Sequence, residues 1–561
     1  MSMVRSSDPV AELRATVLDA VTSVRGAAGE EATAGGALKL ERPKRADQGD
    51  YATNAAMLLA PVLGAPPREI AARVGEAMAE RLGDRLLRYE VAGPGFLNLV
   101  LSDDWHRDAL RAVVEAGEGF GGGGGGAARE RVLVEFVSAN PTGPLVAASG
   151  RHAAYGDALA RILEHHGDTV EREYYFNDAG SQIQRLGESV RARALGREVA
   201  EDGYQGEYVA ELAEVVPGAA DESVPVEEVA AGAVAVLLEQ IKGTLERYGV
   251  HFDRFFSERT LREGSPSELD RALELLEKGG HVYRSEGAVW LRTTSFGDDK
   301  DRVLTRSGGE PTYFAADVAY MLNKRSRGWE RQLLPVGADH HGYVSRLKAA
   351  FAALGGDPDL LEPLIIQFVH LVEGGQVFAM SKRRGDFVTL DDLLDEIGVD
   401  ATRFFMLQRS HDRTLELDVA LARSQSQDNP VYYVQYAHAR IASMLGRLGG
   451  ARVESAVAAG TDWGAMAPED GGLHPSERTL IRKLVALPEE IGEAAERRGP
   501  HRIAAYALEL AQNFTAFYRD CRVVGATPEG VESFRVAVSV ASQSVLALVL
   551  GLLGVSAPSS M

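Results

Sequence analysis

The chain has 561 residues, a length that accommodates roughly three or four domains with a large buried core. It carries 81 acidic against 60 basic side chains, a net charge of −21, which excludes a global attraction to nucleic acid or anionic membranes and leaves such binding to local patches. Its single cysteine, Cys521, excludes an internal disulfide framework and is typical of a reducing cytosol. The N-terminus lacks an apolar segment, so we expect a cytoplasmic protein without a signal peptide.

Residues 1–120 predict an α/β domain. Amphipathic patterns predict helices over 10–24 and 67–82, and the apolar run over 95–102 predicts a strand. Between the helices lies a short basic loop, which either meets phosphates or is simply solvated: Lys39, Arg42, Lys44 and Arg45.

Phe96 and Asn98 stand two apart on this strand and therefore share one of its faces. Such a pair could stack on an unpaired base and hydrogen-bond to it, although an aromatic residue on a strand is more often part of a core.

Six consecutive glycines follow at 121–126. They are costly to order, so residues 121–127 predict a flexible linker and a domain boundary.

The second domain, residues 128–422, opens with a strand, a tight turn and a helix. The apolar run over 132–136 predicts a buried parallel strand, and the turn contains Gly143 and Pro144. In a doubly wound sheet such a turn lies at the carboxyl edge, where backbone N–H groups at the start of the helix face a ligand phosphate. The same pattern also occurs in α/β proteins of unrelated function.

An acidic, helical insertion is predicted over about 189–287, where strand patterns disappear. Strands resume later, and the run over 333–336 ends in polar residues of the kind found in ligand sites. Adjacent His340 and His341 point apart on extended chain, so we expect no metal site there.

A basic loop follows, which either binds a triphosphate or is a plain basic surface turn: Ser381, Lys382, Arg383 and Arg384.

Residues 423–561 predict helices only, in a bundle of about five. The most apolar window, 536–555, is interrupted by three serines and a glutamine. This interruption favours a buried helix over a membrane span.

Five segments of the second and third domains form a recognisable series. In chain order they are VEFVSANPTGPL with the helix behind it, YYFNDAG, GADHHGY, MSKR followed by GDFVTLDDLLDEIGVDATRFFML, and NPVYYVQYAHARIASML. Together they resemble the bacterial arginyl-tRNA synthetases. The resemblance spans nearly the whole chain, from ERPKRADQGDYATNAAMLLA near the start to LGVSAP at the end.

This resemblance implies a class I synthetase of the α/β fold class. It would have a Rossmann-type catalytic domain with a helical insertion, an N-terminal α/β domain that contacts the elbow of the tRNA, and a C-terminal all-α helical bundle that reads the anticodon. In the family reaction, the carboxylate of L-arginine attacks the α-phosphorus of ATP held with Mg²⁺, and the arginyl adenylate then passes to the terminal adenosine of tRNA(Arg). The resemblance further implies a cytoplasmic monomer with no tightly bound cofactor and no membrane partner.

The resemblance also assigns residues to these substrates. Buried carboxylates at Glu135 and Asp317 would accept the paired donors of a planar guanidinium. The arginine pocket would comprise Glu135, Ser138, Asn140, Tyr313 and Asp317. The ATP site would comprise Gly143, Pro144, Ser149, Gly150, Gly337, Asp339, His340, Met380 and Lys382. Pyrophosphate would be held by Ser381, Lys382 and Arg383, and tRNA by Phe96, Asn98, Tyr436 and Arg440.

Two motifs depart from the family pattern. The family's His-x-Gly-His is replaced by Val-Ala-Ala-Ser over 146–149, and the lysine that opens its Lys-Met-Ser-Lys-Ser loop is Ala379. Losing one donor to a developing oxyanion typically costs about a hundredfold to a thousandfold in rate. We hypothesise that the hydroxyl of Ser149 and the charge of either Arg151 or His152, acting with Lys382, replace the lost groups.

These departures leave three interpretations open. The chain is an active arginyl-tRNA synthetase with an altered phosphate site, a non-catalytic relative that binds tRNA or arginine, or an enzyme that passes activated arginine to another acceptor.

Overall fold

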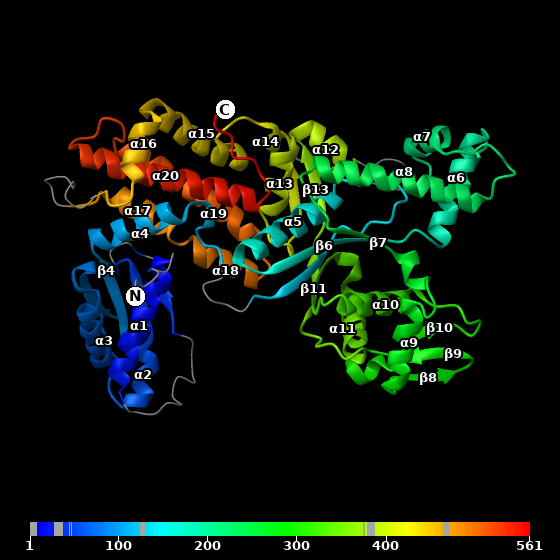
Figure 1. Cartoon of the computed structure of the whole chain (residues 1–561), viewed down its shortest axis with the longest axis horizontal. Coiled ribbons are helices and arrows are strands. Elements are labelled where there is room, and N and C mark those ends of the chain that lie inside the picture. The colour runs from blue at the N-terminus through cyan, green and yellow to red at the C-terminus, as the bar shows by residue number, and fades with distance from the viewer. Residues whose placement is uncertain are drawn as a thin grey trace.

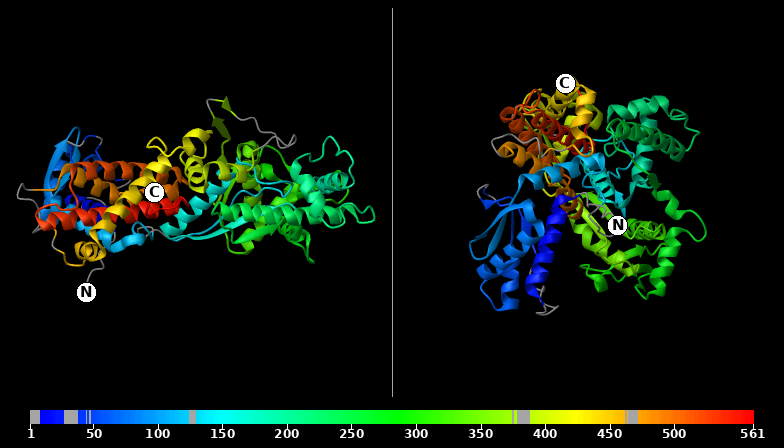
Figure 2. Two further views of the ribbon diagram at one scale, coloured as in Figure 1. Left: turned by 90° about the horizontal axis from the view of Figure 1, so that it is seen from above. Right: turned by 60° about the vertical axis from the view of Figure 1, so that its left-hand side comes forward.

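The computed structural model describes residues 8–26, 38–43, 45, 48–123, 129–373, 376–377, 388–461, 463 and 472–561. Its elements form an N-terminal α/β domain, a central α/β domain and a C-terminal helical domain (Figure 1). Figure 2 shows the same arrangement from two further directions. In these views the N-terminal domain and the helices α6 to α8 lie at opposite ends of the molecule.

The N-terminal domain is a four-stranded antiparallel sheet covered by helices. Its strand order is β1-β2-β4-β3, and Leu97, Leu99 and Leu101 of β4 are completely buried. Asp8 caps the first helix, because its side chain accepts hydrogen bonds from two amides of the first turn at 2.9 and 3.0 Å. The elements are α1 (Pro9–Arg25), β1 (Leu40–Glu41), β2 (Tyr51–Thr53), α2 (Ala55–Leu63), α3 (Pro67–Leu82), β3 (Leu86–Ala92), β4 (Phe96–Leu101) and α4 (Asp103–Ala116).

The central domain is built on a five-stranded parallel sheet with the order β12-β11-β5-β6-β7. The chain moves outward in one direction from β5 to β7 and then returns to the other side of β5 with β11. The carboxyl ends of β5 and β11 therefore form the switch point at which sheets of this kind bind ligands. The strands are β5 (Arg131–Glu135), β6 (Thr169–Phe176), β7 (Arg254–Ser257), β11 (Arg331–Gly337) and β12 (Leu361–Ile366).

Helix α5 (Ser149–His166) packs closely on this sheet. Gly156 faces the ring of Phe136, and a Cβ atom at Gly156 would lie 2.1 Å from the nearest ring carbon. Phe136 is itself completely buried and stacks on Phe252 with ring centroids 4.4 Å apart. The helix ends at Gly167, which adopts a left-handed conformation, as a C-cap requires.

The insertion is not helical throughout, which corrects the prediction for residues 189–287. Helices α6 (Ser181–Ala194), α7 (Glu207–Val215) and α8 (Val226–Arg247) have a small core of their own, but the next segment is strand β7 of the central sheet. β7 has only four residues, RFFS, too few for a period of two to show in the sequence. Beyond it lie α9 (Glu268–Lys278), β8 (Val282–Ser285), β9 (Ala288–Leu291), β10 (Arg302–Thr305), α10 (Tyr313–Ser326) and α11 (Val344–Ala353).

A mixed segment joins the sheet to the helical domain. It comprises β13 (Val369–Glu373), β14 (Gln376–Val377), α12 (Leu390–Ile397), α13 (Val399–Leu407), β15 (Leu415–Asp418) and α14 (Val419–Arg423). Arg403 of α13 is fully buried, pairs with Asp157 of α5 and donates to the carbonyl of Leu553 at 2.9 Å. This guanidinium therefore ties α5 to the C-terminal end of the chain.

The helical domain is organised around its last helix. α20 packs against α15, α16 and α19, and Val545, Leu546 and Val549 are completely buried. Among the described residues α20 is also the one helix long and apolar enough to cross a membrane, and its burial in this domain accounts for that composition. The helices are α15 (Pro430–Leu448), α16 (Gly450–Val457), α17 (Pro475–Leu484), α18 (Leu487–Glu496), α19 (His501–Asp520) and α20 (Glu529–Leu552).

The close approach of α5 to the sheet makes a testable prediction. Gly156→Ala should destabilise the chain by about 2 kcal/mol, because the new methyl group meets a ring that is held on both sides. Gly243→Ala on α8 is the matched control, since no atom lies within 4 Å of its added Cβ, and it should be neutral or stabilising. Thermal melting of both variants measures the difference; equal melting temperatures would contradict the packing argument.

Candidate active site

A cavity of about 400 Å³ lies at the switch point of the central sheet, where β5 and β11 end. Two of the predicted arginine-binding carboxylates line it together with predicted nucleotide-binding residues. The lining residues include Glu135, Ser138, His152, Tyr175, Asp317, Tyr320, Lys324, Gly337 and Tyr343. The cavity thus joins residues from β5, α5, β6, α10 and β11 that are far apart in the sequence.

Glu135 is the last residue of β5, and both of its carboxylate oxygens already have donors. The hydroxyl of Ser138 donates to Oε1 at 3.1 Å, and the ammonium of Lys324 is bonded to Oε2. Ser138 in turn accepts the amide hydrogen of Tyr175 at 3.1 Å. Ser138 has a φ of 41°, so the chain turns sharply here and brings this hydroxyl back to the strand end.

Asp317 lies on the cavity-facing side of α10, and the hydroxyl of Tyr343 donates to its Oδ2. The pKa of Asp317 is raised to about 7, mainly by burial and also by the carboxylates of Glu258 and Glu135. The hydrogen bond from Tyr343 and the charge of Lys324 act in the opposite direction. Near neutral pH this carboxyl is therefore only partly ionised, and a bound cation would favour its charged form.

Spacing along α10 explains why its polar side chains share the cavity. Thr312 caps the helix by accepting the amide of Ala315 at 3.3 Å. Asp317, Tyr320 and Lys324 then follow at intervals of three and four residues on one face. Tyr313 precedes them at the first helical position but is 61% exposed, does not line the cavity, and lies beside the turn at Gly180.

An aromatic wall with its own charged support closes one side of the cavity. The rings of Tyr175 and Tyr320 lie 4.7 Å apart, and the hydroxyl of Tyr175 donates to Glu258 at 2.7 Å. The hydroxyl of Tyr320 donates to Glu173 at 2.6 Å, and Arg327 contacts the same carboxylate. These bonds fix both rings before any ligand enters.

Asn140 is held by the neighbouring turn rather than by the cavity. Its amide donates to Gln182 at 3.1 Å, and its carbonyl oxygen accepts the amide of Asn177 at 3.2 Å. Asn140 therefore connects the turn after β5 to the turn after β6 and does not line the cavity.

Arg151 and His152, the two residues that could replace the positive charge of the family's histidines, have different surroundings in the structure. His152 lines the cavity, one helical turn beyond Ser149. Arg151 is 1% exposed and donates to the carbonyls of Gln367 and Ser410 at 2.8 and 2.9 Å. The guanidinium of Arg151 is thus bonded to backbone carbonyls and, unlike that residue's neighbour His152, Arg151 does not line the cavity; burial lowers the pKa of Arg151 to about 10.

Gly150 also differs from its predicted role at the ATP site. It is buried, its carbonyl accepts the hydroxyl of Tyr248 at 3.2 Å, and an added Cβ would lie 2.8 Å from Leu390. Gly150 therefore allows α12 to approach α5 closely. Gly143 has a similar packing role, since an added Cβ there would lie 3.2 Å from the ring of Tyr208; neither Gly143 nor Pro144 lines the cavity.

The turn that replaces His-x-Gly-His is bonded to the chain that follows the basic loop. Leu145 accepts the amide of Leu390 at 2.8 Å, and Ala147 donates to Val388 at 2.9 Å. The amide of Ser149 donates to the carbonyl of Val146 at 2.8 Å, so this N–H group is used within the turn. The expectation of free N–H groups at the start of α5 is therefore not met at this position.

The structure describes only some of the remaining residues that the resemblance assigns to the ATP site. Gly337 ends β11 and lines the cavity, and Asp339 and His340 follow in the short 3-10 helix Ala338–Tyr343, with side chains outside the described set. Met380, Ser381, Lys382 and Arg383 lie outside the described residues. Within the described ranges, no group of three or more His, Cys, Asp or Glu could hold a metal ion.

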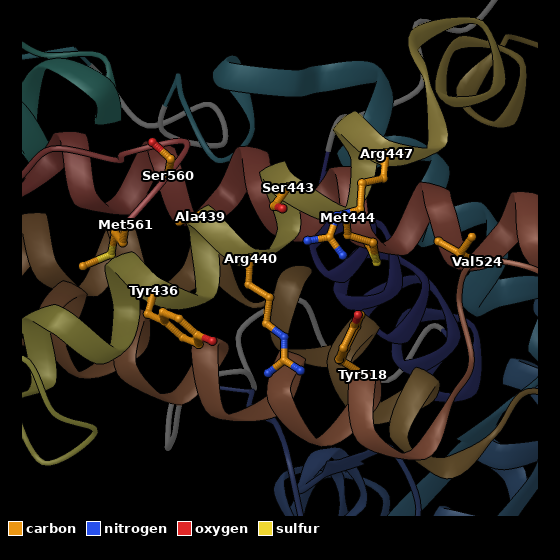
Figure 3. Close-up of a pocket in the computed structure, with 10 residues that line it drawn as sticks. All are labelled: Tyr436, Ala439, Arg440, Ser443, Met444, Arg447, Tyr518, Val524, Ser560 and Met561. Carbon is orange, nitrogen blue, oxygen red and sulfur yellow. The ribbon is translucent and has the colours of Figure 1, made fainter.

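A second cavity, of about 560 Å³, lies on the helical domain (Figure 3). Tyr436 and Arg440 come from successive turns of α15, and the Arg440 guanidinium lies 4.4 Å from the ring centroid of Tyr518 on α19. The C-terminal Met561 completes the wall beside Tyr436. A stacked aromatic and a cation on one surface suit an unpaired nucleobase.

Phe96 and Asn98 lie on β4, as expected, and share a face of the strand. Phe96 is 38% exposed, whereas Asn98 is only 5% exposed. The exposed ring is therefore the part of this pair that is available for stacking.

Taken together, the fold and the cavities define a class of protein. The sequence matches the family models of the arginyl tRNA synthetase N terminal domain over residues 11–101, the catalytic domain of class I (R) tRNA synthetases over 226–428, and the DALR anticodon binding domain over 434–561. A class I aminoacyl-tRNA synthetase has this arrangement, with a cavity at the switch point of the catalytic sheet and the N-terminal and anticodon-binding domains on the outside.

Comparisons with individual proteins narrow the class to a family. The chain is 47% identical to the arginine–tRNA ligase of Frankia alni, covering 93% of this chain and 95% of that protein. It is 43% identical to the arginine–tRNA ligase of Kineococcus radiotolerans, covering 98% and 100%. The structure of the Thermus thermophilus arginyl-tRNA synthetase has a TM-score of 0.74 and 25% identity, covering 98% of this chain and 100% of that one. This chain belongs to the arginyl-tRNA synthetase family.

Sequence reasoning did not identify Lys324, Tyr343 and Glu258, although they surround the two carboxylates. One signal was present for Lys324, because it follows Asp317 by seven residues and thus falls on the same helical face. No comparable signal linked Tyr343 or Glu258 to the site, since both reach it from other elements.

The raised pKa of Asp317 predicts how arginine binding depends on pH. A carboxyl with a pKa of about 7 must lose its proton to pair with a guanidinium, so the Kd for arginine should rise about tenfold from pH 8 to pH 6. In Asp317→Asn the Kd should be higher and independent of pH over this range. Calorimetric titration at constant ionic strength measures both; a flat profile for the unmodified chain would contradict the assignment.

Proposed function

We propose that this chain is an active arginine–tRNA ligase, which activates L-arginine with ATP and transfers it to tRNA(Arg). The observation that carries this proposal is the pair of carboxylates, Glu135 and Asp317, in one cavity at the switch point of the sheet. Near-complete coverage of arginine–tRNA ligases at 47% and 43% identity does not favour a non-catalytic relative.

Arginine would enter with its guanidinium toward these two carboxylates. A planar guanidinium presents five N–H donors, and the carboxylates supply acceptors on two sides of the cavity. The neutral urea of citrulline would leave both carboxylates without a cation, which is the kind of mismatch that supports strong discrimination without editing. Asn140 and Tyr313, which do not line the cavity, are proposed to contact the α-amino and carboxylate end of the substrate.

ATP would lie on the side of Gly337 and His152, as a complex with Mg²⁺. The arginine carboxylate attacks the α-phosphorus, the bond from this phosphorus to the bridging oxygen breaks, and pyrophosphate leaves with the metal. We propose that His152 stabilises the charge that builds on the α-phosphate and that Ser149 donates a hydroxyl bond. Asp339 and His340 would hold the nucleoside, and Met380, Ser381, Lys382 and Arg383 would cover the triphosphate.

The tRNA would bridge the outer domains. Tyr436 and Arg440 are proposed to receive an anticodon base on the helical domain, and Phe96 and Asn98 to contact the tRNA elbow from the N-terminal domain. We further propose the division into residues 1–120, a linker at 121–127, 128–422 and 423–561, and a monomeric, cytoplasmic enzyme.

If His152 supplies the positive charge, substitutions at positions 151 and 152 should affect different properties, namely stability and activity. His152→Ala should lower the rate of arginine-dependent pyrophosphate exchange at least tenfold while leaving the melting temperature unchanged, and Ser149→Ala should have a smaller effect of the same kind. Arg151→Ala should instead lower the melting temperature, because it leaves buried carbonyls without donors.

Exchange and melting are measured on the same preparations. Wild-type exchange rates in His152→Ala would show that this imidazole is not part of the phosphate site.

Aminoacylation of total tRNA with each of the twenty amino acids tests the proposed function as a whole. We expect charging with arginine alone, and pyrophosphate exchange that depends on added tRNA. No charging at high enzyme concentration with magnesium present would reject the proposal.

A further inference from the structure

A buried lysine stands inside the cavity that we assign to a cationic substrate. Lys324 is 1% exposed, and its ammonium is bonded to Oε2 of Glu135. The same ammonium lies 3.9 Å from the ring centroid of Tyr320. A resident cation would be expected to repel a cationic guest, so its presence requires an explanation.

The immediate effect of Lys324 is to fix Glu135. With Ser138 on Oε1 and Lys324 on Oε2, the carboxylate plane is set before the substrate arrives. The aromatic ring of Tyr320 is held in turn by Glu173, so the ammonium has a rigid support on both sides. Burial of an ammonium is tolerated only with such partners.

The second effect concerns the charge of the cavity. The carboxylates of Glu135 and Asp317 line it, Glu258 adds a negative charge near Asp317, and Lys324 cancels one of these charges. A primary ammonium is a compact point charge, so its binding depends mainly on net negative charge and on a free carboxylate oxygen. A guanidinium instead distributes its charge over a plane and binds through several directed donors, which can use the remaining lone pairs of carboxylate oxygens that already accept one hydrogen bond.

We propose that Lys324 is a specificity-determining residue, whose fixed ammonium makes the cavity selective for a guanidinium over the primary ammonium of lysine or ornithine. This inference rests on the proposed function and deepens it. Lys324 holds the carboxylate of Glu135 in the orientation that a planar cation needs, and it repels a compact cation from the same oxygen.

The test compares Lys324→Met with a matched buried lysine. Lys483 on α17 has the same surroundings, with Glu509 at 2.6 Å and the ring centroid of Tyr506 at 4.3 Å, but lies in the helical domain away from the cavity. For each full-length variant, the ratio of the inhibition constant of lysine or ornithine to the KM for arginine is measured in tRNA charging. We expect this ratio to fall at least tenfold in Lys324→Met and to stay unchanged in Lys483→Met.

A second variant keeps the test decisive if Lys324→Met fails to fold. Lys324→Arg retains the buried charge but extends a guanidinium along Glu135, where it competes with the substrate. It should raise the KM for arginine at least tenfold with kcat within threefold of wild type.

The outcomes separate this inference from the function on which it rests. The role of Lys324 alone would be overturned if the wild-type chain charges tRNA with arginine but the variants do not behave as expected. Such a result would be an unchanged discrimination ratio in Lys324→Met or an unchanged KM for arginine in Lys324→Arg. An absence of arginine charging by the wild-type chain would overturn both.

Discussion

The site depends on holding two carboxyl groups, Glu135 and Asp317, inside a partly closed cavity in a state in which they are ionised or can lose a proton. Glu135 achieves this with two fixed donors, Ser138 and Lys324, whereas Asp317 has Tyr343 and a pKa raised to about 7. Buried carboxylates are costly unless paired, so this cavity is best stabilised by a ligand that brings its own positive charge. The sheet order, the end of β5 and the polar face of α10 all serve to bring these two groups together.

The nucleotide side differs from the family pattern to which the sequence was compared. The turn at 146–149 has no imidazole, but backbone bonds join it to residues 388–390, directly beyond the basic loop. His152 lies one turn further along the same helix and faces the same cavity as Gly337. His152 therefore begins one helical turn, about 5.4 Å, beyond Ser149.

Long periodic elements and local turns were predictable from the sequence, whereas side-chain partners across the fold were not. The strand at 132–136 and the helix that follows it, α5, were predictable from spacing alone. β7 was missed because four residues carry no clear period. The choice between Arg151 and His152 could not be made from the sequence, because the partners of Arg151, the carbonyls of Gln367 and Ser410, are more than 200 residues away along the chain.

The most direct measurement of the central claim is a crystal structure of the full chain with L-arginine and a non-hydrolysable ATP analogue. The account predicts a guanidinium within hydrogen-bonding distance of both Glu135 and Asp317, with Lys324 still on Glu135 and His152 facing the α-phosphate. Arginine bound elsewhere, or with its guanidinium directed away from these carboxylates, would contradict the account.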